Sequence, residues 1–405
     1  MTPASPLRSR TLIAYLVSRF CSGAAMMMLR AGIGWHVFAL TQSPFQLGLI
    51  GLVQFLPGLA FMLIGGAIAD TRDRRRTMMI AQSVTMTAAI VLCVATGTGT
   101  VTLPLLYALV VVVAAAAAFD NPARAALLPT LVPREVFPRV VTIAATTQAL
   151  SFATGPALGG VLIGTAGIPA VYGTYALLVA GSIASLALLG PRPPLGGAAR
   201  AVSLSAILEG LRFVRRQPVV LGCMTLDMLA VIFGGATALL PVYATTILHV
   251  DAHGYGLLAS SLELGALLTS IALVFLPTVR RAGPVLLVAV GVYGCATIVF
   301  GASRWFPLSI AAYMVVGIAD QVSVVLRSTA IQLSTPDEMR GRVSAVNFVF
   351  IGASNQLGAA ESGFVAALTS APFAVVSGGV ACLVVVAVIA LVNPALRRYH
   401  VALRA

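Results

Sequence analysis

Long apolar segments, broken at short intervals by charged or Pro- and Gly-rich clusters, constrain this sequence more than any other feature. We find twelve segments near the roughly 20 residues that a membrane-spanning helix needs. Only 9% of the 405 residues are charged, against about 25% in an ordinary soluble protein. So few charges cannot cover a soluble surface, and the runs lack the alternation of a β-barrel strand. We therefore predict an all-α polytopic membrane protein.

The predicted spans form two groups of six. The first group comprises 12–40, 46–69, 77–97, 102–126, 138–165 and 170–189. The second comprises 218–247, 254–278, 283–302, 305–330, 342–368 and 372–393. The connection 190–217 opens with Pro and Gly and then becomes amphipathic, which predicts a linker followed by a short helix on the membrane surface. The predicted domains are a six-helix half at 1–189, this linker, and a second half at 218–405.

Arginines are distributed unequally between the two sides of the predicted bundle. If the N-terminus is cytoplasmic, every inner connection carries arginine and the outer connections carry only Arg304. Basic residues are retained on the cytoplasmic side of membranes, so we predict that both termini are cytoplasmic. The net charge of +13 suits nucleic acid in principle, but it lies in short loops between spans, and we expect no nucleic-acid partner.

The two halves are related by an internal repeat. An ungapped shift of 203 residues superimposes the connection after the fourth span on the connection after the tenth. The matched pairs are Arg124 with Arg327, Pro133 with Pro336, Glu135 with Glu338, Arg139 with Arg342, Gly155 with Gly358 and Gly160 with Gly363. Two parallel six-helix repeats are typical of transporters that alternate access around a central site.

The connection GGAIADTRDRRR, between the second and third spans, resembles a loop signature of the major facilitator superfamily. That signature reads Gly-x-x-x-Asp-Arg/Lys-x-Gly-Arg/Lys-Arg/Lys. It is matched by Gly66, Asp70, Arg74 and Arg75, whereas Thr71 and Asp73 depart from it. The resemblance implies a cytoplasmic gate in which Asp70 pairs with an arginine or caps a helix, while the arginines also anchor the loop.

The stretch SFATGPALGG resembles the fifth-helix signature of the antiporters of this superfamily. The match consists of Gly155, Pro156, Gly159 and Gly160, with Ser151 in place of an earlier glycine. Proline bends a helix and glycines allow a neighbouring helix to approach, so the motif predicts either a seal against proton leak or close packing alone. The fourth-helix arginine of drug/proton antiporters is missing from LLYALVVVVAAAAAFD.

Three further phrases resemble bacterial siderophore exporters of the enterobactin-exporter type and related macrolide-efflux-like proteins. They are GWHVFALTQSPFQLGLIGLVQFLPGLAF, FDNPARAALLPTLVP and FVFIGASNQLGAAESGFVAAL. The resemblance implies a multi-pass protein of the bacterial cytoplasmic membrane, a small-molecule substrate, exchange for protons, a monomer and no cofactor.

Four carboxylates inside predicted spans are candidates for proton coupling: Asp227, Glu263, Asp320 and Glu361. An ionisable residue within the bilayer costs several kcal/mol and usually faces a cavity or a partner. The alternative is a structural ion pair between helices. For Asp320 we expect Arg327, two turns on, as such a partner.

Other polar residues are candidates for the substrate cavity: Arg30, Gln54, Gln148, Asn355 and Gln356. Arg30 is interpreted as the only cation deep in the first half, suited to an anionic substrate. Hydrogen bonds between helices are the alternative for Gln54 and Gln148. Near the inner end of the fourth span we expect a local Asp120–Arg124 pair, and with Arg327 these residues complete the predicted gate.

We therefore predict a secondary active transporter that works by alternating access, most simply a proton-coupled exporter of small amphipathic compounds. A proton-independent facilitator or importer is the alternative, and a non-transporting membrane sensor or scaffold ranks below both. The chain has no GxxxxGK[ST] loop for ATP and no HExxH or GxSxG motif, so we expect no enzyme activity. His249 and His253 alone do not predict a metal site.

Overall fold

The computed structural model describes residues 9–133, 135–191, 204–276 and 279–400, and these ranges contain helices and no strand. At 62, 63, 66, 67, 69, 70 and 204–207 it describes the backbone alone. Eleven helical segments in the described ranges are long and apolar enough to cross a membrane. The helix over the eleventh predicted span is not among them, and it carries Asn355, Gln356 and Glu361. The total of twelve spans therefore stays a prediction.

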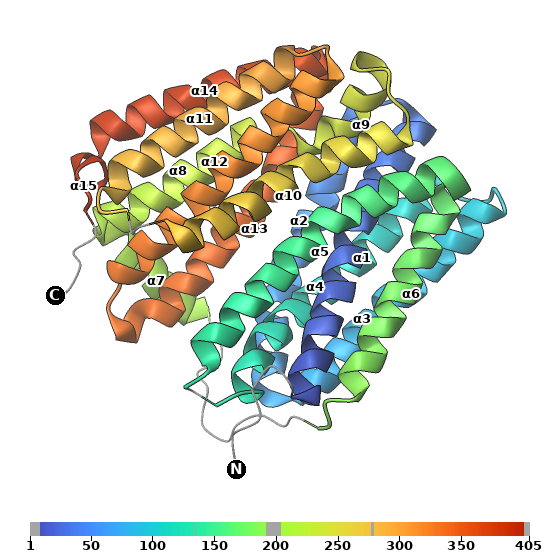
Figure 1. Ribbon diagram of the computed structural model, residues 1–405, viewed down its shortest axis with the longest axis horizontal. Coiled ribbons are helices and arrows are strands. Elements are labelled where there is room, and N and C mark those ends of the chain that lie inside the picture. Colours follow the sequence, from blue (N-terminus) through green and yellow to red (C-terminus); the bar gives the residue numbers. More distant parts are fainter. Residues whose placement is uncertain (1–8, 134, 192–203, 277–278, 401–405) are drawn as a thin grey trace. The chain divides into compact units, whose positions relative to one another are not determined.

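Helices occupy the predicted spans to within a few residues (Figure 1). The first half holds α1 (Arg10–Thr41), α2 (Pro44–Thr71), α3 (Arg74–Gly97), α4 (Leu103–Leu127), α5 (Phe137–Ala166) and α6 (Ile168–Ala187). The second half holds α7 (Leu204–Arg216), α8 (Pro218–Gly234), α9 (Leu240–Val242), α10 (Ala252–Phe275), α11 (Ala282–Ala302), α12 (Phe306–Leu333), α13 (Asp337–Leu368), α14 (Ala371–Val392) and α15 (Pro394–Arg397). α7 is the short helix predicted at the end of the linker.

Local sequence determines where several helices start. Proline occupies the first or second position of α4, α5, α6, α8, α12 and α14, where its missing N–H costs no helical hydrogen bond. Asp73, Thr102 and Ser370 cap α3, α4 and α14 by accepting a hydrogen bond from a first-turn N–H. The Asp73 cap gives a physical reason for its departure from the loop signature, because glycine has no side chain to accept that bond.

The seventh predicted span, 218–247, is long and apolar enough to cross a membrane, as predicted, but it is not one continuous α-helix. α8 ends at Gly234, and Gly235 is extended with φ −77° and ψ 91°. A 3-10 turn at Thr237–Leu239, α9 and a π-helical turn at Tyr243–Ile247 then complete the segment. The paired glycines Gly234 and Gly235 allow this break because they favour non-helical backbone more than other residues do.

The chain forms two compact units. Unit 1 comprises Met1–Leu40, Val53–Ala201 and Ala252–Ser260, and within it α3 packs on α4 and α6 while α5 packs on α6. Unit 2 comprises Thr41–Leu52, Val202–Asp251 and Ser261–Ala405. Within unit 2, α11 packs on α12 and α14, and α8 packs on α13 and α14. α7 packs on α13 as well, where Glu209 pairs with Arg342 at 2.8 Å.

Equivalent glycines of the repeat make equivalent close contacts in each unit. In unit 1, a Cβ on Gly155 would lie 2.6 Å from the carbonyl oxygen of Ala24, beside Met28 of α1. In unit 2, a Cβ on Gly358 would lie 2.6 Å from the carbonyl oxygen of Val231 in α8. Val231 is the repeat equivalent of Met28 and not of Ala24. Each glycine therefore packs on the corresponding helix of its unit, at carbonyl groups that differ by one helical turn.

A second pair of close contacts follows the same rule. In unit 1, Gly160 of α5 faces Gly256 in the first turns of α10, and a Cβ on Gly160 would lie 2.5 Å from the Cα of Gly256. In unit 2, Gly363 of α13 faces Gly48 of α2 with no room for a Cβ. Small residues at such crossings let two helix backbones approach closely.

We predict that Gly160→Ala lowers the melting temperature of the detergent-solubilised protein, because its methyl group overlaps the α10 backbone. Overpacking of this kind costs about 1–3 kcal/mol. Gly159→Ala, one residue earlier, is the matched control, because a Cβ there meets the flexible Met28 side chain at 3.3 Å. That variant should melt at or above the wild-type temperature, since alanine favours helix by about 1 kcal/mol. Equal melting temperatures of the two variants would contradict the close approach of α5 to α10 at Gly160.

Candidate functional site

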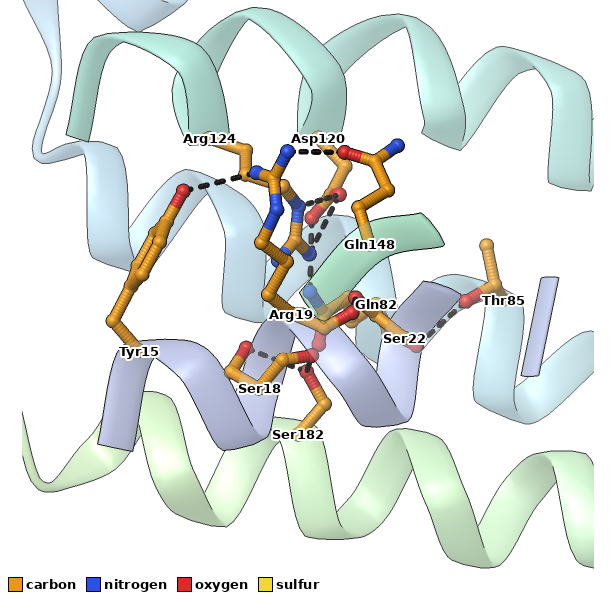
Figure 2. Close-up of polar contacts among 10 residues, drawn as sticks. All are labelled: Tyr15, Ser18, Arg19, Ser22, Gln82, Thr85, Asp120, Arg124, Gln148 and Ser182. Atoms are coloured by element: carbon orange, nitrogen blue, oxygen red, sulfur yellow. Dashed lines mark hydrogen bonds and ion pairs between the residues drawn. The ribbon is translucent and has the colours of Figure 1, made fainter. Parts of the chain in front are cut away.

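Arg19 of α1 is the centre of a polar network inside unit 1 (Figure 2). Its Nε donates to the carbonyl oxygen of Ala144 at 2.9 Å, and one terminal nitrogen donates to the Tyr15 hydroxyl at 3.1 Å. The other terminal nitrogen donates to the side-chain oxygen of Gln148 on α5. Each guanidinium nitrogen is thus engaged, which is how a cation is accommodated among packed helices.

The sequence prediction missed Arg19 and was wrong to treat Arg30 as the only deep cation of the first half. Arg19 is the tenth residue of a 32-residue helix, about 14 Å along its axis from the first residue. Its spacing from Tyr15 was the available signal, because residues four apart share one helix face. Gln148 is therefore occupied by an interhelical hydrogen bond, the alternative considered for it.

Asp120 and Arg124 of α4 form the expected local ion pair, with 2.9 Å between Arg124 Nη2 and Asp120 Oδ2. Both side chains are largely buried. Gln82 of α3 donates to the other carboxylate oxygen of Asp120 at 2.9 Å, so the pair also joins α3 to α4 (Figure 2). Ser18 and Ser182 lie 2.8 Å apart and link α1 to α6 beside this group.

The arginines of the loop signature differ in their environments. Arg75 donates to the carbonyl oxygens of Leu186 and Ala187 at 2.8 and 2.9 Å, at the end of α6, where the Leu186 carbonyl also accepts the backbone N–H of Leu189. Arg74 is buried, and among the described residues its Nε and one terminal nitrogen have no hydrogen-bond partner. The surroundings of Gly66 and the side chain of Asp70 lie outside what the structure describes. The gate role of these four residues stays a prediction.

Asp227 of α8 and Arg327 of α12 form a buried ion pair in unit 2. Their side chains are only 9% and 4% exposed, which makes this the more deeply buried of the described membrane ion pairs. The expected partner of Arg327 was Asp320 on its own helix, and that expectation is wrong. Arg327 reaches across to another helix instead, and its Nε has no hydrogen-bond partner within the described ranges.

Side chains of neighbouring helices donate hydrogen bonds to the backbone carbonyl groups that are left open where α8 ends. The hydroxyl of Tyr293 donates to the carbonyl oxygen of Gly234 at 3.0 Å. The hydroxyl of Ser362 donates to the carbonyl oxygen of Gly235 at 2.8 Å and also lies 3.3 Å from a carboxylate oxygen of Glu361. Carbonyl groups freed within a membrane need such partners. Glu361 is thereby connected, through one hydroxyl, to the interrupted helix.

The remaining residues that the sequence predicted for the site take no part in the Arg19 network, the two buried ion pairs or the contacts at the break after α8, as far as the described contacts show. Arg30 is exposed within its unit, Gln54 of α2 and Gln356 of α13 are half-buried, and Asn355 donates to the carbonyl oxygen of Ile351 on its own helix at 2.8 Å. Glu263 of α10 and Asp320 of α12 are half-buried too. Gly155, Pro156, Gly159 and Gly160 are all buried along α5. No group of three or more metal-ligating side chains occurs in the described residues.

Sequence comparison places this architecture among known proteins. A family model described as "Transmembrane secretion effector" matches residues 1–402. The enterobactin exporter EntS of Citrobacter koseri is 26% identical over 392 residues, covering 96% of this chain and 92% of the relative. The EntS protein of Escherichia coli O1:K1 is 27% identical over 394 residues, with the same two coverages.

Solved structures of transporters share the fold. A bacterial homologue of the human lysosomal transporter Spinster superposes with a TM-score of 0.68 at 15% identity, covering 97% of both chains. A POT family transporter in complex with 5-aminolevulinic acid gives a TM-score of 0.71 at 13% identity, with 96% of both chains covered. The human organic anion transporter MFSD10 gives 0.64 at 14% identity, covering 95% of this chain and all of that one.

We predict that Asp227→Asn and Arg327→Gln are each strongly destabilising but far from additive. Removing one partner of a buried pair leaves the other charge uncompensated, at a cost of about 3–5 kcal/mol. The double variant should therefore recover much of that loss in detergent melting. The Asp337–Arg340 pair at 2.9 Å, with side chains 80% and 54% exposed, is the control cycle and should change stability by under about 1 kcal/mol. Additive losses at 227 and 327 would contradict the pair.

We also predict that Ser362→Ala destabilises unit 2 by about 1–3 kcal/mol, because the partly buried Gly235 carbonyl loses its donor. Ser377→Ala is the control, since the Ser377 hydroxyl donates to the carbonyl oxygen of Phe373 in its own helix, at 2.7 Å. Hydrogen exchange at 231–239 should rise in the first variant and not in the second. Equal hydrogen exchange at 231–239 in the two variants would show that Ser362 does not stabilise the backbone where α8 ends.

Proposed function

Because the chain belongs to the major facilitator family of transmembrane secretion effectors, a family of multi-pass membrane transporters, we propose that it is a proton-coupled exporter. The proposed cargo is a small amphipathic compound of the siderophore or drug type. The proposed location is the bacterial cytoplasmic membrane, with twelve spans, both termini in the cytoplasm and the protein working as a monomer without a cofactor. Full-length similarity to enterobactin exporters supports export and this substrate class.

The Asp227–Arg327 ion pair is the observation that carries the coupling proposal. A carboxylate that is only 9% exposed is stable as an anion while its arginine partner is present. Protonation of Asp227 removes that charge and leaves Arg327 as an uncompensated cation in a low-dielectric setting. The conformation that best re-solvates or re-pairs Arg327 is then favoured, which gives the proton gradient a means of shifting the conformational equilibrium.

The Arg327 guanidinium retains a donor that can form a new hydrogen bond during such a change. Its unpartnered Nε is a donor held away from water, and this arrangement is costly unless a partner arrives during the cycle. An anionic group of the cargo or a second carboxylate would serve. Proton release from Asp227 restores the pair and returns the transporter to its starting state.

Glu361 is the second coupling candidate, because Ser362 connects it to the break after α8. A change of charge at Glu361 alters how strongly its carboxylate competes for the Ser362 hydroxyl, and hence the hydrogen bond from that hydroxyl to the Gly235 carbonyl. Glu263 and Asp320 are retained as weaker candidates. In unit 1 we assign Arg30 and Gln54 to cargo recognition, with Asn355 and Gln356 as the candidates of unit 2.

A proton-independent facilitator or importer is the alternative function. It is favoured by one observation, the absence of a basic residue from the first seventeen residues of α4, where drug/proton antiporters carry an arginine. Facilitated movement needs neither a titrating carboxylate nor uphill transport. The two functions therefore differ in their response to a collapsed gradient.

We predict that the purified protein in sealed vesicles moves a catecholate siderophore uphill only while a pH gradient is imposed. Asp227→Asn should reduce uphill transport at least tenfold, since the neutral amide cannot exchange a proton, while downhill counterflow of the siderophore continues. Glu361→Gln should have a smaller effect of the same kind. Asp337→Asn, an exposed carboxylate at the start of α13, is the matched control and should transport at the wild-type rate.

Three outcomes would count against the proposal in different ways. Transport that is unaffected by a proton ionophore would identify the facilitator. Uphill transport by Asp227→Asn at the wild-type rate would remove the coupling role of the pair and leave export intact. Folded protein that moves no siderophore or amphipathic drug under any gradient would remove the transport function itself.

A further inference from the structure

A long groove on unit 1, separate from the network in Figure 2, has one charged end and a mostly apolar lining, in which Thr77, Ser83 and Thr87 are the further polar side chains. It lies along the end of α2, α3 and α4, where one cavity of about 910 Å³ adjoins a second of about 650 Å³. The two cavities share Arg76, Ile80, Val84 and Val112 in their linings and so form one continuous depression.

The apolar length of the groove is accessible from outside the protein. Ile80 and Val84 on α3 are 57% and 42% exposed, and Val91, farther along the same helix, is 41% exposed. Val112 on α4 forms part of the opposite wall. From Arg76 to Val91 the groove follows α3 for about 22 Å, at 1.5 Å per residue. One leaflet of a bilayer has about 15 Å of hydrocarbon, so an acyl chain fits this length.

The charged end carries two exposed arginines, Arg72 and Arg76, beside the Thr71 hydroxyl. Asp73 also lines this end, but its carboxylate accepts the backbone N–H of Arg76 at 3.1 Å as the cap of α3. Arg75 is occupied by the end of α6. Positive charge at a helix N-terminus opposes the helix dipole, so an anion bound at this end would relieve an unfavourable arrangement.

We propose that this groove binds an anionic phospholipid, with its phosphate on Arg72 and Arg76 and one acyl chain along α3 and α4. The charge complementarity is specific to an acidic headgroup, and the apolar length is specific to a lipid tail. The arginine distribution predicts that this end faces the cytoplasm, and acidic lipids are attracted there by basic residues close to the membrane. A free phosphate would use only the charged end.

The test compares lipids that share acyl chains, by native mass spectrometry of the purified full-length protein. Wild type should retain phosphatidylglycerol in preference to phosphatidylcholine. Arg72→Gln/Arg76→Gln should reduce the affinity for phosphatidylglycerol roughly thirtyfold, at about 1 kcal/mol for each basic residue, and leave phosphatidylcholine unaffected. Arg397→Gln/Arg398→Gln removes two exposed arginines, the last residue of α15 and the residue after it, and is the matched control, which should bind like wild type.

A second variant tests the tail independently of the charges. Ile80→Trp lies on the exposed face of α3, so it should fold, and its indole should block both cavities. Retention of both lipids should then fall, including the phosphatidylcholine that the arginine variant leaves unaffected. The melting temperature of each variant without added lipid checks that the fold is intact.

Four lipid-binding results, and one change of oligomeric state, would overturn the proposal. The first four are undiminished phosphatidylglycerol binding by Arg72→Gln/Arg76→Gln, an equal loss in the α15 control, unchanged retention by Ile80→Trp, and displacement of the lipid by millimolar inorganic phosphate. The last result would identify a soluble-anion site. A groove blocked by a second copy of the chain would instead give a dimer whose mass excludes added lipid, and this too would contradict lipid occupancy.

Discussion

Hydrocarbon offers a peptide group no hydrogen-bond partner, and the rest of this structure depends on that constraint. Every N–H and C=O within a span has to be satisfied by the chain itself, so the apolar segments become helices. Where α8 stops at Gly234, the same rule brings Tyr293 and Ser362 to the two open carbonyl groups. Arg75 donates to carbonyl groups at the end of α6 in the same way, from a neighbouring helix.

Two arginines inside the helix bundles, Arg19 of unit 1 and Arg327 of unit 2, have their charges satisfied by different means. Unit 1 distributes the charge of Arg19 over a carbonyl, a phenol and an amide, which are all neutral acceptors. Unit 2 places Arg327 against the carboxylate of Asp227 alone. A cation held by neutral groups is insensitive to protons, whereas one held by a carboxylate depends on them. Proton sensitivity is thus expected at Arg327 and not at Arg19. Unit 1 also holds a carboxylate–arginine pair, Asp120–Arg124, but that pair is more exposed and its carboxylate accepts a further hydrogen bond from Gln82.

Sequence alone predicted the helices well, because span length is set by the bilayer and helix ends by proline, caps and arginine. It also predicted the Asp120–Arg124 pair, since residues four apart meet on any helix. It failed for Arg327, because a partner on another helix depends on how each helix is rotated about its axis, and periodicity in an all-apolar segment does not report that rotation. The break at Gly234 and Gly235 was visible as paired glycines, yet a span-length criterion passed over it.

Ser362 has a consequence that follows from counting hydrogens. A hydroxyl group has one hydrogen, and it is given to the Gly235 carbonyl at 2.8 Å while Glu361 lies 3.3 Å away. An ionised Glu361 competes for that single hydrogen, whereas a protonated Glu361 can donate one of its own to the hydroxyl oxygen and leave the carbonyl bond in place. The Ser362 hydroxyl can therefore donate either to the Gly235 carbonyl or to the Glu361 carboxylate, but not to both. The protonation state of Glu361 decides which of the two accepts the hydrogen bond.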